Sequence, residues 1–292
     1  MTDLMTAGGN DMGPGGREAW RMFFRNKAAV AGLIMLIGVI FMTYVGPILY
    51  DQDPSDIVAR PLKGPGTEDI PTFGTDYLGR DVLAGVINGG STSLKVAAVA
   101  AALIVLIGVT IGSLAGFYGG WVDSALMRFT ELFQVLPALL FSLVVVALFE
   151  PSPLTISVAI GVVLWPQIAR ITRAEFLRLK NLEFVKAARA IGASDMRIMF
   201  RVILPNALPP LIVATTLVTG GAILFEAGLA FLGLGDPNKV SWGLSIGLNR
   251  GNFLTSWWTV TFPGLAIFVT VLSFSLIGDG LQDAFNPKLR GR

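Results

Sequence analysis

Few side chains in this 292-residue sequence could do bond chemistry. Histidine and cysteine are both absent, which removes the commonest general base, the thiolate nucleophile and two common metal ligands. Carboxylates remain: Glu226 stands in a long apolar run, and Asp76 and Asp81 stand close to Arg80. Carboxylates without histidine or cysteine specify little about a metal. We therefore predict no catalytic site, no metal site and no cofactor held by this chain.

Nucleotide and nucleic-acid binding are also disfavoured. The phosphate-binding pattern G-x-x-x-x-G-K-[ST] does not occur, so the chain lacks the usual ATP site. The formal net charge is only +2, which predicts no nucleic-acid partner. Any ATP-driven process would therefore need a separate motor subunit.

Charge gathers instead in one segment, between Ala169 and Pro210. Its basic residues are Arg170, Arg173, Arg178, Lys180, Lys186, Arg189, Arg197 and Arg201, set against Glu175, Glu183 and Asp195. Apolar stretches flank the segment on both sides. Basic residues near the ends of membrane helices favour the cytoplasmic side, so we expect this segment to face the cytoplasm.

The elements that hold this segment are apolar. The sequence is 53% hydrophobic and 14% charged, whereas soluble domains carry about 25% charged residues. Six stretches approach the roughly 20 residues that a bilayer-spanning helix needs. They are Ala28–Tyr50, Val96–Phe117, Leu132–Phe149, Leu154–Ala169, Ala207–Phe231 and Trp257–Ile277. The pattern predicts an all-α polytopic membrane protein with six transmembrane helices.

Basic residues before the first stretch and after the last place both ends of the chain in the cytoplasm. The first stretch is too long for a signal peptide and is predicted to be retained. The expected organisation is a cytoplasmic tail (1–27), a first transmembrane helix (28–50), an external loop (51–90), a transmembrane core (91–282) that includes a cytoplasmic coupling loop (170–205), and a cytoplasmic tail (283–292).

Within the coupling loop, the pattern predicts two short helices. Gly192 can adopt the left-handed conformation that ends a helix. Ser194 can cap the next helix and Asp195 suits its first turn, while Pro205 is expected to stop it. Two interpretations are open: an amphipathic loop lying on the bilayer, or a coupling helix that inserts into a groove of a partner.

This loop resembles the cytoplasmic motif of ABC importer permeases: Glu-Ala-Ala, three residues, Gly, nine residues, Ile, one residue, Leu-Pro. The chain matches in register at Ala187, Ala188, Gly192, Leu204 and Pro205. Lys186 stands in the place of the glutamate, and Val202 in that of the isoleucine. The resemblance implies contact with an ATPase by the matching residues together with Ala193, Ser194 and Asp195.

Other segments resemble the C-type permeases of dipeptide and oligopeptide importers. They are PTFGTDYLGRDVLAGVINGGSTSL, EAGLAFLGLGDPNKVSWG, GDGLQDAFNPKLR and the pattern of Trp20, Phe23 and Asn26. The resemblance covers Trp20 to Arg290. It implies a type I ABC importer permease fold in the lipid of a bacterial inner membrane. It also implies a second, B-type permease, two ATPase subunits that use ATP and Mg²⁺, and an external substrate-binding protein.

Several alternatives stay open. Glu226 either lines the translocation path, lies at a partner interface or makes a structural hydrogen bond. Arg80 is expected to pair locally, and its segment either builds the external loop or contacts the binding protein; the residues in question are Thr75, Asp76, Gly79, Arg80 and Asp81. Nickel, glutathione or another small solute could replace a peptide as substrate. Among other protein classes, a secondary transporter or channel would work without ATPases, and an intramembrane enzyme would need a catalytic constellation.

A stripe of glycines in the second apolar stretch also has two interpretations. Gly108, Gly112 and Gly116 recur at four-residue spacing. Small residues at that spacing let two helices approach closely. The neighbouring helix belongs either to the same chain or to another subunit.

Overall fold

Residues 16–66 and 70–285 are described by a computed structural model, and within these ranges the chain forms helices and loops without a β-strand. Five helical segments there are long and apolar enough to cross a membrane: α2 (Lys27–Tyr44), α4 (Val82–Tyr118), α7 (Pro153–Leu179), α10 (Leu204–Leu229) with its π-helical extensions, and α12 (Trp258–Phe285). The pair of α5 (Gly120–Val135) and α6 (Ala138–Ala147) passes the same test only when its two helices, bent by 85°, are counted as one span, which gives a sixth. The all-α polytopic prediction is confirmed.

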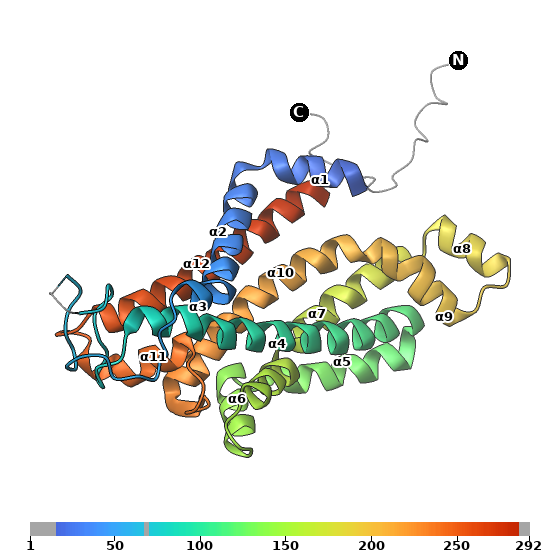
Figure 1. Cartoon of the computed structure of the whole chain (residues 1–292). Helices are drawn as coiled ribbons and strands as arrows, with labels where there is room; N and C mark the ends of the chain where they lie inside the picture. The colour runs from blue at the N-terminus through green and yellow to red at the C-terminus, as the bar shows by residue number, and fades with distance from the viewer. Residues whose placement is uncertain (1–15, 67–69, 286–292) are drawn as a thin grey trace.

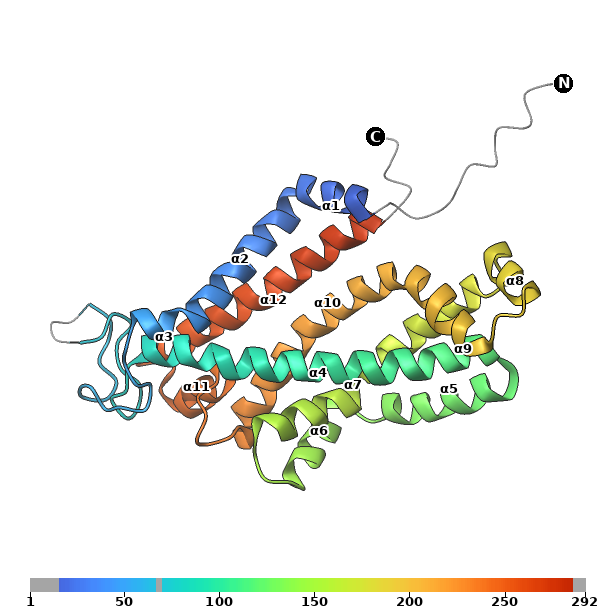
Figure 2. The same cartoon turned by 45° about the vertical axis from the view of Figure 1, so that its right-hand side comes forward.

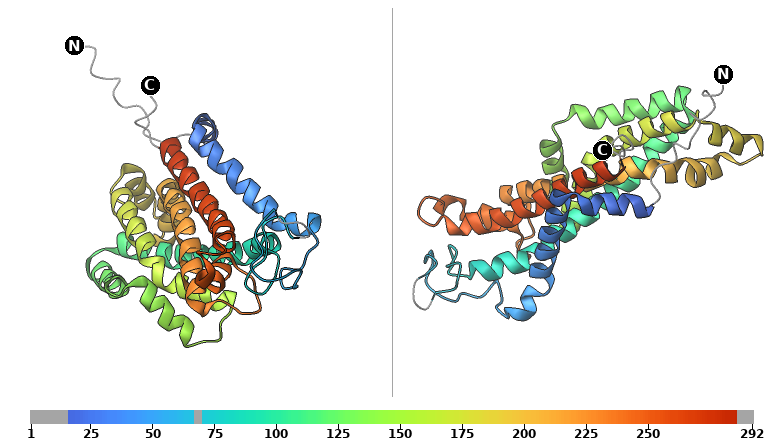
Figure 3. Two further views of the ribbon diagram at one scale, coloured as in Figure 1. Left: turned by 90° about the vertical axis from the view of Figure 1, so that its left-hand side faces the viewer. Right: turned by 90° about the horizontal axis from the view of Figure 1, so that it is seen from above.

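The long helices run side by side, and two groups of short elements lie at opposite ends of the bundle (Figures 1 and 2). One end carries α3 (Gly46–Leu49), the loop that follows it, and α11 (Trp242–Asn249). The other carries α8 (Glu183–Ala190) and α9 (Asp195–Arg197). Figure 3 shows the same bundle along its length and from above. We refer to these as the α11 end and the α8 end.

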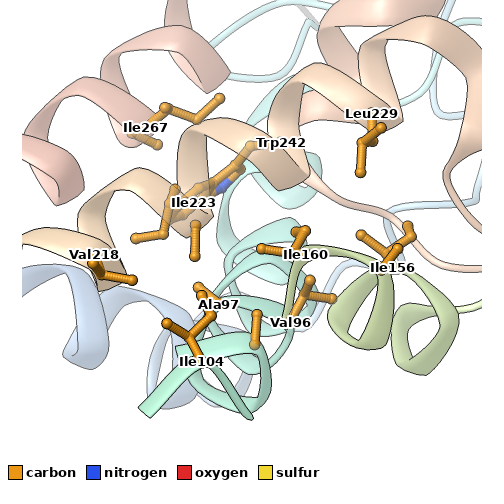
Figure 4. Packing of buried hydrophobic residues seen from close by; sticks show 14 of the residues in the cluster. Val96, Ala97, Ile104, Ile156, Ile160, Val218, Ile223, Leu229, Trp242 and Ile267 are labelled. Carbon is orange, nitrogen blue, oxygen red and sulfur yellow. The ribbon is translucent and has the colours of Figure 1, made fainter. Parts of the chain in front are cut away.

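The main core lies where α4, α7, α10 and α12 converge beside Trp242 (Figure 4). Ile104, Ile160 and Ile223 are fully buried there. A second, smaller cluster lies at the α8 end. It joins Phe117 of α4 and Phe176 of α7 to the short helices, through Val185, Ile198, Met199 and Ile203. The α8 end therefore has its own apolar packing, which fixes it to the bundle.

The N-terminal pattern of Trp20, Phe23 and Asn26 forms a corner between α1 (Gly16–Arg25) and α2. The Asn26 side chain caps α2 by accepting from the backbone N–H of Ala28, and it donates to Asp283 of α12 over 3.0 Å. Phe23 is buried against Ala29 and Ala284. The pattern therefore ties the start of the chain to the last helix.

The glycine stripe of α4 packs against α7. An added Cβ on Gly108, Gly112 or Gly116 would lie 2.7 Å or less from an atom of α7. At Gly112 it would lie 2.3 Å from the carbonyl oxygen of Ala169. The stripe therefore serves packing within the chain, and the alternative of an interface with another subunit is wrong.

This packing predicts opposite effects for two glycines of α4. Gly112→Ala should lower the melting temperature by several degrees, because backbone atoms of α7 must move; such overpacking costs about 1–3 kcal/mol. An added Cβ on Gly85 meets nothing within 4 Å, so Gly85→Ala should preserve or raise the melting temperature through its better helix propensity. Intrinsic fluorescence in detergent measures both, and equal effects would contradict the packing argument.

Several boundaries differ from the expectation. The first apolar helix ends at Tyr44 rather than Tyr50, and α4 begins at Val82, inside the segment expected to be loop. Helix α7 continues past Ala169 to Leu179. Pro205 does not stop the second short helix: a π-helical segment (Ile198–Ile203) leads directly into α10, and Pro205 lies in its first turn, where no intrahelical N–H is needed.

Candidate functional site

The α8 end is built around a left-handed glycine. Gly192 has φ +79°, as expected, and follows α8 directly. Its N–H donates to the Arg189 carbonyl over 3.0 Å, and the N–H of Ala193 donates to the Ala188 carbonyl over 3.1 Å. These two bonds form a complete Schellman motif, which satisfies the last carbonyls of α8. An added Cβ at Gly192 meets nothing within 4 Å, so conformation rather than space requires glycine.

The residues predicted to contact an ATPase divide into two groups. Ala188, Ala193 and Leu204 pack against the small cluster beneath the short helices. The others are exposed, namely Ala187, Gly192, Ser194, Asp195 and Pro205. Ser194 is at the N-cap of α9, but its side chain makes no capping hydrogen bond. Only the exposed group is available to a partner.

Apolar side chains accompany the exposed group. Ile191 is 86% exposed and Met196 60%, and Phe184 is also exposed. Exposed apolar side chains around a helix–turn–helix are typical of a contact surface for another protein. Lys186, which replaces the motif's glutamate, pairs with Glu183 over 2.9 Å on the solvent side, a contact worth little stability.

Two cations fix the start of this segment to α4 and α5. Lys180 donates to the Gly116 carbonyl over 2.8 Å, at the negative end of α4. Arg173 forms a bidentate ion pair with Asp123 of α5, with one N–O distance of 2.7 Å. The segment is therefore attached to three long elements, and a displacement of α8 would be passed to them.

At the α11 end, the described parts of the loop, residues 51–66 and 70–81, fold over the start of α4. Thr75 is fully buried: its hydroxyl donates to the Arg60 carbonyl over 2.7 Å and accepts from the Lys63 N–H over 2.9 Å. Asp76 accepts from the N–H groups of Leu78 and Arg80, both over 2.8 Å. These contacts assign Thr75 and Asp76 to the structure of the loop.

Gly79 and Asp81 also build this loop. Gly79 has φ +87°, and an added Cβ would lie 2.1 Å from the Ala59 carbonyl oxygen. Asp81 caps α4 through the N–H of Leu83 over 2.7 Å and accepts from the hydroxyl of Tyr50. Burial, with the hydrogen bond and charge of Asp81, raises the pKa of Tyr50 to about 12, so its hydroxyl remains a donor at neutral pH.

Arg80 is the exception among these five residues. Its backbone is held in the loop, but its guanidinium makes no hydrogen bond or ion pair with any residue in the described ranges. Its Nε is buried without a partner. The expectation that Arg80 pairs locally is therefore wrong.

Glu226 is enclosed at the junction of α4, α10 and α11. It is 1% exposed, and the hydroxyls of Ser241 and Ser93 lie within hydrogen-bonding reach of its carboxyl group. Each hydroxyl accepts a backbone N–H as well: Ser93 from Trp242 over 3.3 Å, and Ser241 from Leu244 over 3.2 Å. The second carboxyl oxygen has no partner among the described residues.

Comparison of the sequence with known protein families identifies the family of this chain. Residues 108–291 match the family model "Binding-protein-dependent transport system inner membrane component", and residues 16–65 match "N-terminal TM domain of oligopeptide transport permease C". The chain belongs to the binding-protein-dependent transport permease family. It is accordingly a transport subunit of the inner membrane and not an enzyme, as the sequence predicts.

Similar proteins cover nearly all of this permease. It is 40% identical over 281 residues to a dipeptide transport system permease protein of Bacillus subtilis, covering 94% of this chain and 86% of the relative. It is 39% identical over 281 residues to an oligopeptide transport system permease protein of Haemophilus influenzae, covering 94% and 90%. The inward-facing methionine ABC transporter MetNI shares the fold, with a TM-score of 0.54 and 18% identity over 69% of this chain and 96% of that chain.

Proposed function

We propose that this permease forms the translocation path of an ATP-driven importer of dipeptides or oligopeptides. A second, B-type permease completes the path, two ATPase subunits supply the work from ATP and Mg²⁺, and an external binding protein delivers the substrate. Both ends of the chain and the α8 end face the cytoplasm, and the α11 end faces outward. Peptide as the substrate class is supported by the relatives, which are named as dipeptide and oligopeptide permeases.

One observation carries the proposal. The helix–turn–helix of α8 and α9, which we call the docking element, is partly apolar and lies at the opposite end of the bundle from the external loop (Figure 1). Its turn is closed by the Schellman bonds at Gly192, and Ile191 and Met196 project from it. Such an element suits insertion into a groove of a cytoplasmic partner. A loop lying on the bilayer would need no such fixed turn.

In the proposed mechanism, closure of the ATPases displaces α8 and α9. Lys180 and Arg173 pass the displacement to α4 and α5, because both are bonded to those helices. The bundle then changes between outward and inward access. The chain contributes a path and a lever, and bond breaking takes place in the partner subunits.

We predict that the purified chain transports nothing alone. Reconstitution in liposomes with the two ATPases, the second permease and the binding protein of the same transporter should give ATP-dependent uptake of labelled peptide. Omitting any one component should reduce uptake to the background. Nickel or glutathione accumulating in place of peptide would overturn the substrate class. Uptake by the chain alone, without ATP, would indicate a secondary transporter or channel and overturn the whole proposal.

A further inference from the structure

A small cavity lies at the α11 end, between residues 54 and 76–81 of the external loop, the start of α4, the segment before α11, α11 itself and the start of α12. Its volume is about 70 Å³. That is room for roughly five water-sized volumes, which suits the end of one side chain and not a whole peptide. Its polar lining residues are Asp76, Arg80, Asp81, Lys239, Ser245, Asn249 and Thr259.

Most polar groups of this lining already have partners. Asp76 and Asp81 accept backbone N–H groups, and Asp81 also accepts the Tyr50 hydroxyl. Asn249 accepts the Tyr77 N–H over 3.1 Å and donates to the Ser245 carbonyl over 2.8 Å. Both oxygens of Asp81 and one oxygen of Asp76 therefore accept local hydrogen bonds, and no local bond from a side chain of the described residues reaches the cations.

Two cations at the cavity have no such partners. Within the described residues, the guanidinium of Arg80 has none, and Lys239 is exposed and forms no ion pair. A buried donor without a partner costs about 1–3 kcal/mol. That cost is removed when an acceptor enters the cavity, and a carboxylate is the acceptor whose geometry suits a guanidinium best.

The backbone around Arg80 is rigid. Its N–H donates to Asp76, and its carbonyl accepts from the Asp76 N–H over 2.9 Å. Gly79, just before it, packs against Ala59 in a conformation that favours glycine. The backbone that carries the guanidinium is therefore fixed before any ligand arrives, which removes the backbone part of the entropic cost of binding.

We propose that this cavity receives an aspartate or glutamate side chain of the external binding protein, bound by Arg80 with Lys239 at the rim. The proposal rests on the proposed function, because it needs a protein partner at the α11 end. Charge complementarity and the one-side-chain volume favour an acidic side chain over a whole substrate molecule. Arg80 becomes a docking residue that helps the loaded binding protein engage the permease.

The test uses the complete transporter in liposomes with the binding protein that supports uptake. ATPase activity is measured against binding-protein concentration for wild type, Arg80→Gln and the control Arg60→Gln, whose side chain lies on the same loop and is exposed. Arg80→Gln should raise the half-maximal concentration by roughly tenfold or more, because it removes one partner of a desolvated charge pair. Arg60→Gln should change it by less than about twofold.

A double-mutant cycle identifies the carboxylate. Acidic residues of the binding protein are replaced one at a time by amides, and one of them should weaken docking in wild type but cause no further loss in Arg80→Gln. Equal behaviour of the Arg80 and Arg60 variants, or no such acidic residue, overturns the proposal. If the Arg80→Gln transporter fails to assemble, Lys239→Gln is tested instead. Removal of this rim charge should change the half-maximal binding-protein concentration and its dependence on salt, and an unchanged value would overturn the proposal. If the ATPase activity and uptake of the wild-type transporter do not respond to any binding protein, the proposed function itself is overturned.

Discussion

Replacing Gly192 by leucine should abolish peptide uptake while the associated ATPases continue to hydrolyse ATP. The residue has φ +79°, where a side chain with a Cβ costs roughly 1–2 kcal/mol. Leucine would favour a different backbone conformation and break the two Schellman bonds that set the angle between α8 and α9. The docking element would then present Ile191 and Met196 in the wrong positions. Uptake and phosphate release, measured on the same proteoliposomes, give the coupling ratio.

The matched control for this prediction is Gly192→Asn. Asparagine tolerates the left-handed conformation better than other side chains with a Cβ. An added Cβ meets no atom of the chain within 4 Å, so asparagine fits without moving a neighbour. This variant should keep most of its coupled uptake. Full coupling in the leucine variant, with normal complex yield, would show that the turn is not part of the lever.

The sequence predicts the number and class of the helices well, because long apolar runs leave few alternatives to membrane helices. It predicts their ends poorly. The first turns of α4 contain Gly85, Asn88, Gly89 and Gly90, which individually disfavour a helix. They are nevertheless helical and closely packed: an added Cβ on Gly90 would lie 2.4 Å from the Thr43 hydroxyl oxygen, and one on Gly89 would lie 3.3 Å from Trp242. Tertiary packing therefore overrides local propensity. These contacts join residues that are distant in the sequence, so no local pattern predicts them.

The bend between α5 and α6 has a sequence signal that hydropathy hides. Pro137 follows Leu136, and the residue before a proline is pushed out of the helical conformation; Leu136 has ψ 134°. The apolar run continues across the break, so it resembles one straight span. In helix α7 the sequence signal misleads in the opposite direction. The charges from Arg170 onward predict that the helix ends, but it continues to Leu179, with Arg173 paired to Asp123.

The functional residues differ in how far sequence can place them. Gly192 was predictable, because a local turn requires a particular residue type. The unpaired state of Arg80 was not, since the nearby aspartates suggest partners and only the folded loop shows that they are used elsewhere. The surroundings of Glu226 were equally hidden: Ser93 and Ser241 come from separate elements.

The buried position of Glu226 favours a role in fastening α11 to α10 and α4. The carboxyl group meets two serine hydroxyls, and each hydroxyl also holds a backbone N–H at the start of α11. An ion pair for it is absent from the described part of the chain. A buried ionised carboxylate without a counter-ion is costly, so a neutral acceptor of the same shape should serve equally well.

We therefore expect Glu226→Gln to retain complex yield and uptake, and Glu226→Leu to lose both. Leucine removes the acceptor and leaves the O–H donors of Ser93 and Ser241 without a partner in an apolar site, at a cost of about 1–3 kcal/mol for each buried group. Complex yield, melting temperature and peptide uptake are measured on the same preparations. A path residue that needs its charge would behave differently: Glu226→Gln would assemble normally but transport poorly. That outcome would move Glu226 from the helix junction to the translocation path.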